Sequence, residues 1–161
     1  MDMITIRKLR LSDVNAAYGL MQAVLSSELK YYSNNSRKWE LWAYNPKRMR
    51  FDIKSKYSVM LGASIDKKLV GVEMAFVEYG GVINSDWLLI DKKYRDHGIG
   101  KKLIHQAEVV SKRMGMHKIY GDTEIKNKKA QAFMRKVGWK KVATLMDWNW
   151  HENRYVWEKK L

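Results

Sequence analysis

The sequence predicts a single α/β domain over residues 1–161, with a mixed, mostly antiparallel sheet of about seven strands flanked by about four helices. Three observations predict this class. The chain has 161 residues, of which 46% are hydrophobic and 30% charged, and this suits one globular domain with one core. Short β-rich runs are interspersed with segments of helical periodicity. No linker, repeat or low-complexity tract divides the chain.

The first part of the chain predicts a strand followed by two helices. Residues 4–7 predict the strand, and Ser12 and Asp13 can cap the helix that comes next. One face of that helix is apolar and carries Val14, Ala17, Tyr18, Met21 and Leu25. An aromatic and polar connection covers residues 30–45, and Pro46 then suits the first turn of a second helix that continues to about Lys54.

Three β-rich runs form the middle of the chain, over residues 58–65, 69–78 and 82–90. The links between them are short enough for hairpins. We therefore expect an antiparallel meander.

The last part of the chain returns to helical periodicity. An amphipathic helix over residues 99–114 ends at Gly115, and a second helix follows Asn127, a possible N-cap, and ends at Gly138. Three strands complete the predicted sheet, at residues 117–124, about 140–148 and about 155–159.

The charge of the chain is strongly positive and unevenly distributed. Its formal net charge is +14, from 31 Lys+Arg against 17 Asp+Glu, and residues 91–141 hold 15 of the basic residues but only 5 of the acidic ones. Any one of these lysines suits a solvated surface. The segment as a whole indicates an anionic partner, of which a polyphosphate is one kind.

Several classes of protein are excluded or disfavoured. The absence of Cys excludes disulfides, cysteine-ligated metals and a cysteine nucleophile. The four His show no metal spacing, so we expect no metal site. No apolar run approaches the 18 or so residues that span a bilayer, and the first residues lack the pattern of a signal peptide. We therefore expect a cytoplasmic protein with no membrane partner.

The segment from Arg95 to Gly100 carries the clearest chemical signal. It lies between a predicted strand and a predicted helix, and its two glycines let backbone N–H groups approach a ligand, with the positive end of the helix behind them. A dinucleotide fingerprint would require Gly where Leu103 stands, and a phosphate-binding Walker loop would require Ser or Thr in place of Lys102. The segment predicts a phosphate cradle of another kind, although an ordinary strand–helix turn also explains it.

The run from Leu88 to Ile104, with Arg95-x-x-Gly98-x-Gly100 at its centre, resembles the acetyl-CoA signature of the GNAT superfamily of N-acetyltransferases. A second block, Asn127-x-x-Ala130-x-x-Phe133 followed by Val137-Gly138-Trp139, resembles the downstream helix of that family. The two blocks have the family's order and separation. The resemblance implies a GNAT-like acyl-CoA N-acyltransferase fold and transfer of an acetyl group from acetyl-CoA to a primary amine by direct attack in a ternary complex.

The resemblance also implies a binding residue set for coenzyme A. The strand before the signature splays from its neighbour in this family, so its backbone pairs with the pantetheine arm, and the loop amides hold the pyrophosphate. Lys101, Lys129 and Lys136 are candidates for the 3′-phosphate. The whole implied set is Leu88, Leu89, Ile90, Arg95, Asp96, His97, Gly98, Ile99, Gly100, Lys101, Asn127, Lys129, Ala130, Phe133, Met134 and Lys136.

Met134 is a departure from the family, which commonly has Tyr at this position as the acid that protonates the departing thiolate. Met cannot donate a proton. A thiol with a pKa of about 8.5 leaves without much help, whereas an attacking ammonium with a pKa of about 10.4 must lose a proton. We expect Asp86 to be the base, because it shares strand parity with Leu88 and Ile90, and Glu73 on the adjacent strand to be the second candidate.

The acceptor is the least determined part of the prediction. The aromatic stretch with Tyr31, Tyr32 and Trp39 occupies the connection that overhangs the acceptor site in this family, so these residues are candidate substrate contacts. The basic surface favours a neutral or acidic protein or peptide acceptor over polyamines, unless local charge at the cleft reverses this. A nucleic-acid- or ribosome-binding module that keeps the fold without catalysis is the alternative function.

Overall fold

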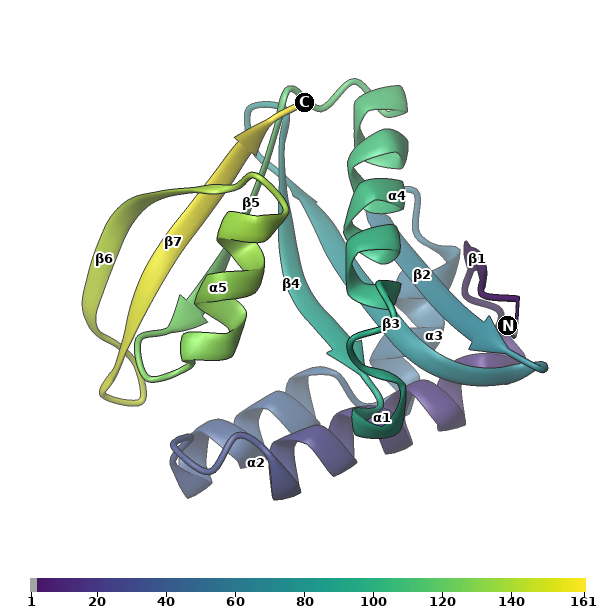
Figure 1. The fold of residues 1–161 in the computed structure, drawn as a ribbon, viewed down its shortest axis with the longest axis horizontal. Helices are drawn as coiled ribbons and strands as arrows, with labels where there is room; N and C mark the ends of the chain where they lie inside the picture. The colour runs from purple at the N-terminus through teal and green to yellow at the C-terminus, as the bar shows by residue number, and fades with distance from the viewer. Residues whose placement is uncertain (1–2) are drawn as a thin grey trace.

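The computed structural model describes residues 3–161, which form seven strands, five α-helices and two short 3₁₀ helices (Figure 1). The strands are β1 Thr5–Lys8, β2 Ser58–Ile65, β3 Lys68–Glu78, β4 Val82–Ile90, β5 Lys118–Glu124, β6 Lys140–Asn149 and β7 Glu152–Lys160. The helices are α1 Val14–Ser27, α2 Asn34–Ala43, α3 Pro46–Lys54, α4 Ile99–Arg113 and α5 Lys128–Lys136, with 3₁₀ helices at Leu11–Asp13 and Lys92–Tyr94.

All seven strands belong to one sheet, in the order β1-β2-β3-β4-β5-β7-β6. The meander of β2, β3 and β4 is antiparallel as predicted, and the β4–β5 pair is parallel. The connection from β4 to β5 contains α4, as a parallel crossover requires. The predicted fold class, a mixed and mostly antiparallel sheet with flanking helices, is confirmed.

The sheet has a separate hydrophobic cluster on each face. On one face, Leu103, Ile104 and Ala107 of α4 and Met134 of α5 pack against the sheet. On the other face, α1 contributes Val14, Ala17, Met21, Val24 and Leu25, and α3 adds Met49 and Ile53. In Figure 1, α4 and α5 accordingly lie on one side of the sheet, and α1, α2 and α3 lie on the other.

Local sequence signals explain most of the helix boundaries. Asn45 caps α3, because its Oδ1 accepts hydrogen bonds from the amides of Lys47 and Arg48 at 3.0 and 3.1 Å. Asn127 caps α5 as expected, and its Oδ1 accepts from the amide of Ala130 at 3.1 Å. None of the helices formed by residues 3–161 is long and apolar enough to cross a membrane.

The helix α2 differs from the prediction, which placed a connection over residues 30–45. Ser33 caps this helix by accepting a hydrogen bond from the amide of Ser36 at 3.1 Å. Ser36 is fully buried and donates its hydroxyl to Glu152 Oε1 of β7 at 2.6 Å. Contacts distant in the sequence therefore stabilise α2, whereas its polar and aromatic composition has low intrinsic helix propensity.

Candidate active site

The strands β4 and β5 separate in the middle of the sheet (Figure 1). They pair only where Val82–Asn84 faces Lys118–Tyr120. Gly121 follows on β5 at a point of close approach, because a Cβ there would lie 2.6 Å from the Ser85 carbonyl oxygen. From Leu88 to Ile90, β4 stays paired with β3 but has no partner on β5 within residues 3–161. The resemblance implies that the pantetheine arm of coenzyme A binds in this opening.

A β-bulge places Asp86 at the start of this opening. Ser85 faces Ala75 of β3 and Trp87 faces Met74, so Asp86 has no residue opposite it on β3. The alternation counted back from Leu88 and Ile90 is interrupted here, so strand parity alone does not determine the face on which Asp86 lies. The charged groups that act on Asp86 are Glu40, Asp122 and Arg154, and Glu40 belongs to α2 on the face opposite α4.

The loop before α4 is shaped to present backbone amides. Gly98 has φ 75°, a left-handed conformation that favours glycine, and α4 begins at the next residue. The first hydrogen bond of the helix runs from the amide of Lys102 to the carbonyl of Gly98 at 3.1 Å. The amides of Ile99, Gly100 and Lys101 precede it, so they point out of the helix at its positive end. This arrangement suits a phosphate group.

Arg95 fixes this loop to the rest of the domain. Its Nε and Nη2 donate to the carbonyl oxygen of Ile90 at 3.1 and 3.0 Å, and its Nη1 pairs with Glu28 at the end of α1. The side chain of Arg95 is thereby engaged within the protein. Only the backbone of Arg95 is left to face a ligand, while Asp96, His97 and Lys101 have exposed side chains.

The helix α5 lies beside the start of α4. A Cβ on Gly100 would come within 3.2 Å of the Phe133 ring, so the two helices approach closely at this glycine. Lys129 and Lys136 are exposed on α5, whereas Ala130 is partly buried. Met134 is 8% exposed and packs in the cluster beneath α4. Its position in the core explains why an apolar side chain is accommodated there.

Asp86 has the properties of a base that works near neutral pH. The pKa of Asp86 is raised to about 7, mainly by burial and in addition by the nearby carboxylates of Glu40 and Asp122, against the opposing effect of Arg154. No hydrogen-bond donor among residues 3–161 pairs with its carboxylate. A carboxyl in this state accepts a proton more readily than an ordinary aspartate.

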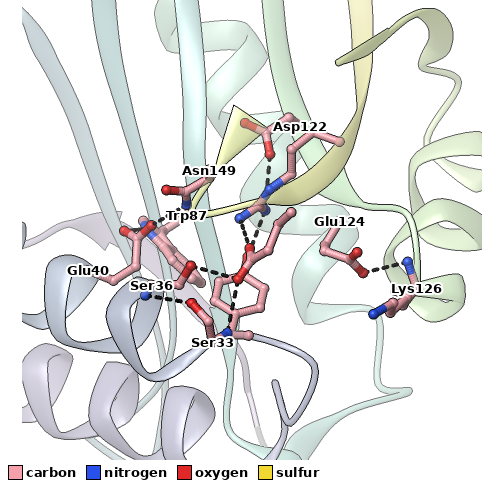
Figure 2. Close-up of polar contacts among 11 residues, drawn as sticks. Ser33, Ser36, Glu40, Trp87, Asp122, Glu124, Lys126 and Asn149 are labelled. Carbon is pink, nitrogen blue, oxygen red and sulfur yellow. Dashed lines mark hydrogen bonds and ion pairs between the residues drawn. The ribbon is translucent and has the colours of Figure 1, made fainter. Parts of the chain in front are cut away.

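Arg154 of β7 forms three hydrogen bonds to neighbouring side chains, one of them to Asp122, which Figure 2 labels. Its Nη1 donates to the hydroxyl of Tyr32 at 2.8 Å and to Asp122 Oδ1 at 3.2 Å, and its Nη2 donates to Glu152 Oε2 at 2.9 Å. Glu152 also accepts from the amide of Ser33 at 3.1 Å. The network therefore ties the start of α2 to β5 and β7, on the side of the opening that faces Asp86.

Glu40 projects from α2 toward the same region (Figure 2). Its Oε2 accepts from Trp87 Nε1 of β4 at 3.3 Å, and its Oε1 accepts from Asn149 Nδ2 of β6 at 3.4 Å. Both donors are neutral and both hydrogen bonds are long. Burial raises the pKa of Glu40, and the two hydrogen bonds only partly oppose this effect.

Glu73, the second candidate base, lies in a different environment. It is fully buried on β3, and its Oε1 accepts a hydrogen bond from Ser85 Oγ at 2.5 Å. Its strand neighbour on the same face, Gly71, approaches Ile99 and Leu103 of α4. Burial raises the pKa of Glu73 to about 8. Glu73 therefore faces the α4 side of the sheet, away from Glu40 and its neighbours.

The three aromatic residues expected to contact the acceptor occupy different positions. Tyr32 is buried and bound to Arg154, and Tyr31 is partly buried beside it, with ring centroids 5.6 Å apart. Burial and the nearby Glu124 raise the pKa of Tyr31 to about 12. Trp39 is 48% exposed and lines a shallow hollow with Trp42 and Trp150. Tyr32 thus belongs to the network and Tyr31 packs beside it, whereas Trp39 lines the hollow that it shares with Trp42 and Trp150.

Sequence reasoning missed four members of this site, namely Glu40, Asp122, Glu152 and Arg154. They come from α2, β5 and β7, so no motif joins them in the sequence. One signal was present, since Asp122 and Glu124 are charged residues in a predicted strand, while Glu152 lies in the predicted turn before the last strand and Arg154 directly precedes that strand. Charged residues in strands near a sheet opening are candidates for a binding site.

The comparisons with known proteins agree with this geometry. A model of the acetyltransferase (GNAT) family matches residues 21–139. Among solved structures, the chain is similar to the PaiA N-acetyltransferase of Thermoplasma acidophilum in complex with coenzyme A, with 22% identity, a TM-score of 0.82 and 99% of each chain covered. No curated protein matches the sequence.

Two further solved structures share the fold over nearly the whole chain. One is the ribosomal-protein-S18-alanine N-acetyltransferase of Escherichia coli, with 15% identity, a TM-score of 0.75 and coverage of 98% of this chain and 94% of that one. The other is Ard1 of Thermoplasma volcanium, with 18% identity, a TM-score of 0.72 and coverage of 98% and 97%.

Proposed function

Because the chain belongs to the acetyltransferase (GNAT) family, we propose that it transfers an acetyl group from acetyl-CoA to a primary amine bound beside Asp86, by direct attack in a ternary complex. The observation that carries this proposal is the combination of two features at one opening. An amide cradle at the start of α4 lies at one end, and a carboxyl group with a pKa of about 7 lies at the other.

The residues around α4 fit coenzyme A. The free amides of Ile99, Gly100 and Lys101 suit the pyrophosphate, and Gly98 keeps a conformation that a side chain would strain. The unpaired edge of β4 at Leu88–Ile90 suits the amide groups of the pantetheine arm. The exposed Lys129 and Lys136 on α5 are candidates for the 3′-phosphate. Bound acetyl-CoA supplies an activated acetyl thioester.

The chemical step requires a neutral amine at the acetyl carbon. The amine nitrogen forms a bond to that carbon, the carbon–sulfur bond breaks, and the surplus proton of the amine passes to the Asp86 carboxylate directly or through a water molecule. Glu73 stays the second candidate for the base. It is fully buried on the α4 side, which makes it the weaker of the two.

The leaving thiolate needs no dedicated acid in this proposal. Met134 offers no proton and is buried. A thiolate whose conjugate acid has a pKa of about 8.5 is a fair leaving group, and it takes up a proton from solvent after departure.

The test is release of free thiol from acetyl-CoA in the presence of a panel of amines. We expect retention of acetyl-CoA by the protein and amine-dependent release of one thiol for each acetylated product. RNA binding that weakens with salt, together with no thioester turnover on any amine, would support the alternative of a nucleic-acid- or ribosome-binding module.

A further inference from the structure

A hollow of about 430 Å³, the edge hollow, lies beside β1 at the margin of the sheet. It is lined by Thr5, Arg7, Arg10, Ser64, Asp66 and Lys67. Two strands, β2 and β3, separate β1 from β4 and its opening toward β5 (Figure 1). The edge hollow is therefore distinct from the site proposed for acetyl-CoA and the acceptor.

Strand pairing brings three polar side chains of the edge hollow to one face of the sheet. Thr5 lies opposite Ser64, and Arg7 lies opposite Gly62, in the antiparallel pair of β1 and β2. Residues that lie opposite each other, or two positions apart on one strand, share a face. Met60 has the same parity as Ser64 on β2 and packs in the cluster beneath α1. The two hydroxyls and the guanidinium therefore project on the α1 side.

The cations of the edge hollow exceed its carboxylates. Asp13 holds the guanidinium of Arg7 by two hydrogen bonds of 2.7 and 3.0 Å, and the Arg7 side chain stays 28% exposed. Arg10 and Lys67 are exposed, and neither forms an ion pair within residues 3–161. The carboxylate on the lining is Asp66. Two cations and one carboxylate thus remain unpaired at the edge hollow.

A second observation indicates a ligand that can accept a hydrogen bond. Ser64 is 7% exposed, and its Oγ has no hydrogen-bond partner among residues 3–161. Buried polar groups are generally paired, with protein groups, ligands or bound water. Because the Oγ is buried, a ligand contacts it only after an exposed side chain of the lining changes rotamer. Such changes take picoseconds to nanoseconds, so they do not prevent access.

We propose that the edge hollow binds a small molecule with a phosphate monoester group, which pairs with Arg7, Arg10 and Lys67 and accepts a hydrogen bond from Ser64. A phosphate group presents three strong acceptor oxygens in different directions. The donors of the edge hollow also come from different directions, since they belong to β1, the segment after it, β2 and the β2–β3 turn. Arginine and lysine are the usual partners of phosphate in proteins.

The size and position of the edge hollow favour a small ligand over a nucleic acid. Pockets for small molecules commonly have volumes of about 300–1,000 Å³, a range that includes this one. A nucleic acid is held by contacts to several successive phosphates. The basic segment over residues 91–141 contributes no residue to the lining, and Asp66 interrupts the positive charge. One phosphate group suits this arrangement.

The test is calorimetric titration with glycerol 3-phosphate of protein that is saturated with coenzyme A, so that the amide cradle at the start of α4 is filled. We expect binding of glycerol 3-phosphate and none of glycerol. Arg10→Gln should weaken this binding at least tenfold, the usual effect of losing a hydrogen bond to a charged group. The matched control is Arg113→Gln, because Arg113 is an exposed arginine at the end of α4, on the other face of the sheet.

Two substitutions in the β2–β3 turn separate binding from folding. Asp66 and Lys67 have φ of 48° and 66°, and a turn of this kind favours Asn or Asp first and Gly second. Lys67→Gly should therefore raise the unfolding temperature while it weakens binding of glycerol 3-phosphate at least threefold. Asp66→Asn keeps a residue that suits the turn and removes a negative charge, so it should strengthen binding about twofold. A general loss of structure cannot produce this pair of results.

Ser64→Ala tests the buried hydroxyl and should weaken binding about tenfold. The proposal would be overturned by a parent protein that does not bind glycerol 3-phosphate, or by unchanged affinity in Ser64→Ala or in folded Arg10→Gln. Weaker binding in Asp66→Asn would reject an anionic ligand. Binding that coenzyme A abolishes and that Arg10→Gln leaves unchanged would assign the phosphate to the amide cradle and would overturn the proposal as well.

Discussion

Replacing Asp86 with Asn tests the centre of the proposed mechanism. The substitution keeps the shape of the side chain and removes the base. An aspartate with its ordinary pKa of 3.8 is a poor acceptor for a proton from an amine of pKa about 10.4. Raising the pKa of Asp86 to about 7 reduces that mismatch by about 3 units, or about 4 kcal/mol at about 1.36 kcal/mol per unit.

We expect Asp86→Asn to lower kcat by about 10²- to 10⁴-fold at pH 7, the usual contribution of a general base. Its affinity for acetyl-CoA should hold, because Asp86 lies at the opposite end of the opening from the amide cradle. Asp147→Asn removes one negative charge outside the site and serves as the control for a general charge effect. Thiol release measures turnover, and calorimetry measures the affinity.

The pH profile makes the prediction sharper. A group with a pKa of about 7 is about 10% ionised at pH 6 and about 90% at pH 8. The parent should therefore gain about ninefold in rate across this interval from Asp86 alone. Asp86→Asn should lose this rise and recover activity only as free amine accumulates toward pH 10.

The reasoning would be refuted by a folded Asp86→Asn protein whose kcat lies within threefold of the parent and whose pH profile is unchanged. Glu73→Gln would then be the next variant to measure. If both variants turn over normally, bulk water accepts the proton.

The remaining predictions concern the cofactor and stability. Gly98→Val strains a left-handed position, and Gly100→Val places a side chain against α5. Each substitution should therefore weaken binding of coenzyme A at least tenfold, as measured by calorimetry. Unchanged affinity in a folded variant would contradict the assignment of these amides to the pyrophosphate. Lys129→Ala and Lys136→Ala should reduce affinity for coenzyme A more than for its dephosphorylated analogue, and equal losses would reject the 3′-phosphate assignment. Burial raises the pKa of Glu73 from 4.5 to about 8, so the folded state holds a proton there that the unfolded state releases, and stability should fall as pH rises between these values. Thermal unfolding at pH 5 and pH 9 should show a smaller loss in Glu73→Gln than in the parent, and equal losses would contradict this origin.

The parts of the fold and site that the sequence predicted are those determined by neighbouring residues. Residues 58–90 predicted the meander because strand alternation and short turns are local features. The backbone amides at the start of α4 could also be predicted, because Gly98 and the first residues of α4 are contiguous in the chain. The helix α2 was missed, since its stability depends on the bond from Ser36 to Glu152, which lies 116 residues further on.

The local charge around Asp86, where we propose that the acceptor binds, could not be predicted from composition. A net charge is a sum over the whole surface, whereas the acceptor meets only the side chains that the fold brings to one opening. The basic excess over residues 91–141 favoured a neutral or acidic acceptor, and the same interval contains Asp122, which the fold places with Glu40 and Asp86. Local charge has the opposite sign from the total.

The bulge in β4 shows that the face on which a residue lies cannot always be derived from the alternation of one strand. Period-two alternation assigned Asp86 to the face of Leu88 and Ile90, and one extra residue between Ser85 and Trp87 breaks that count. No glycine or proline in Val82–Ile90 marks the bulge, which becomes apparent only in the pairing of β4 with β3. The same separation of β4 from β5 opens the site in which Asp86 meets Glu40 and Asp122. The raised pKa of Asp86 comes from its burial and from the carboxylates of Glu40 and Asp122, which belong to α2 and β5, so the alternation of a single strand could not show it.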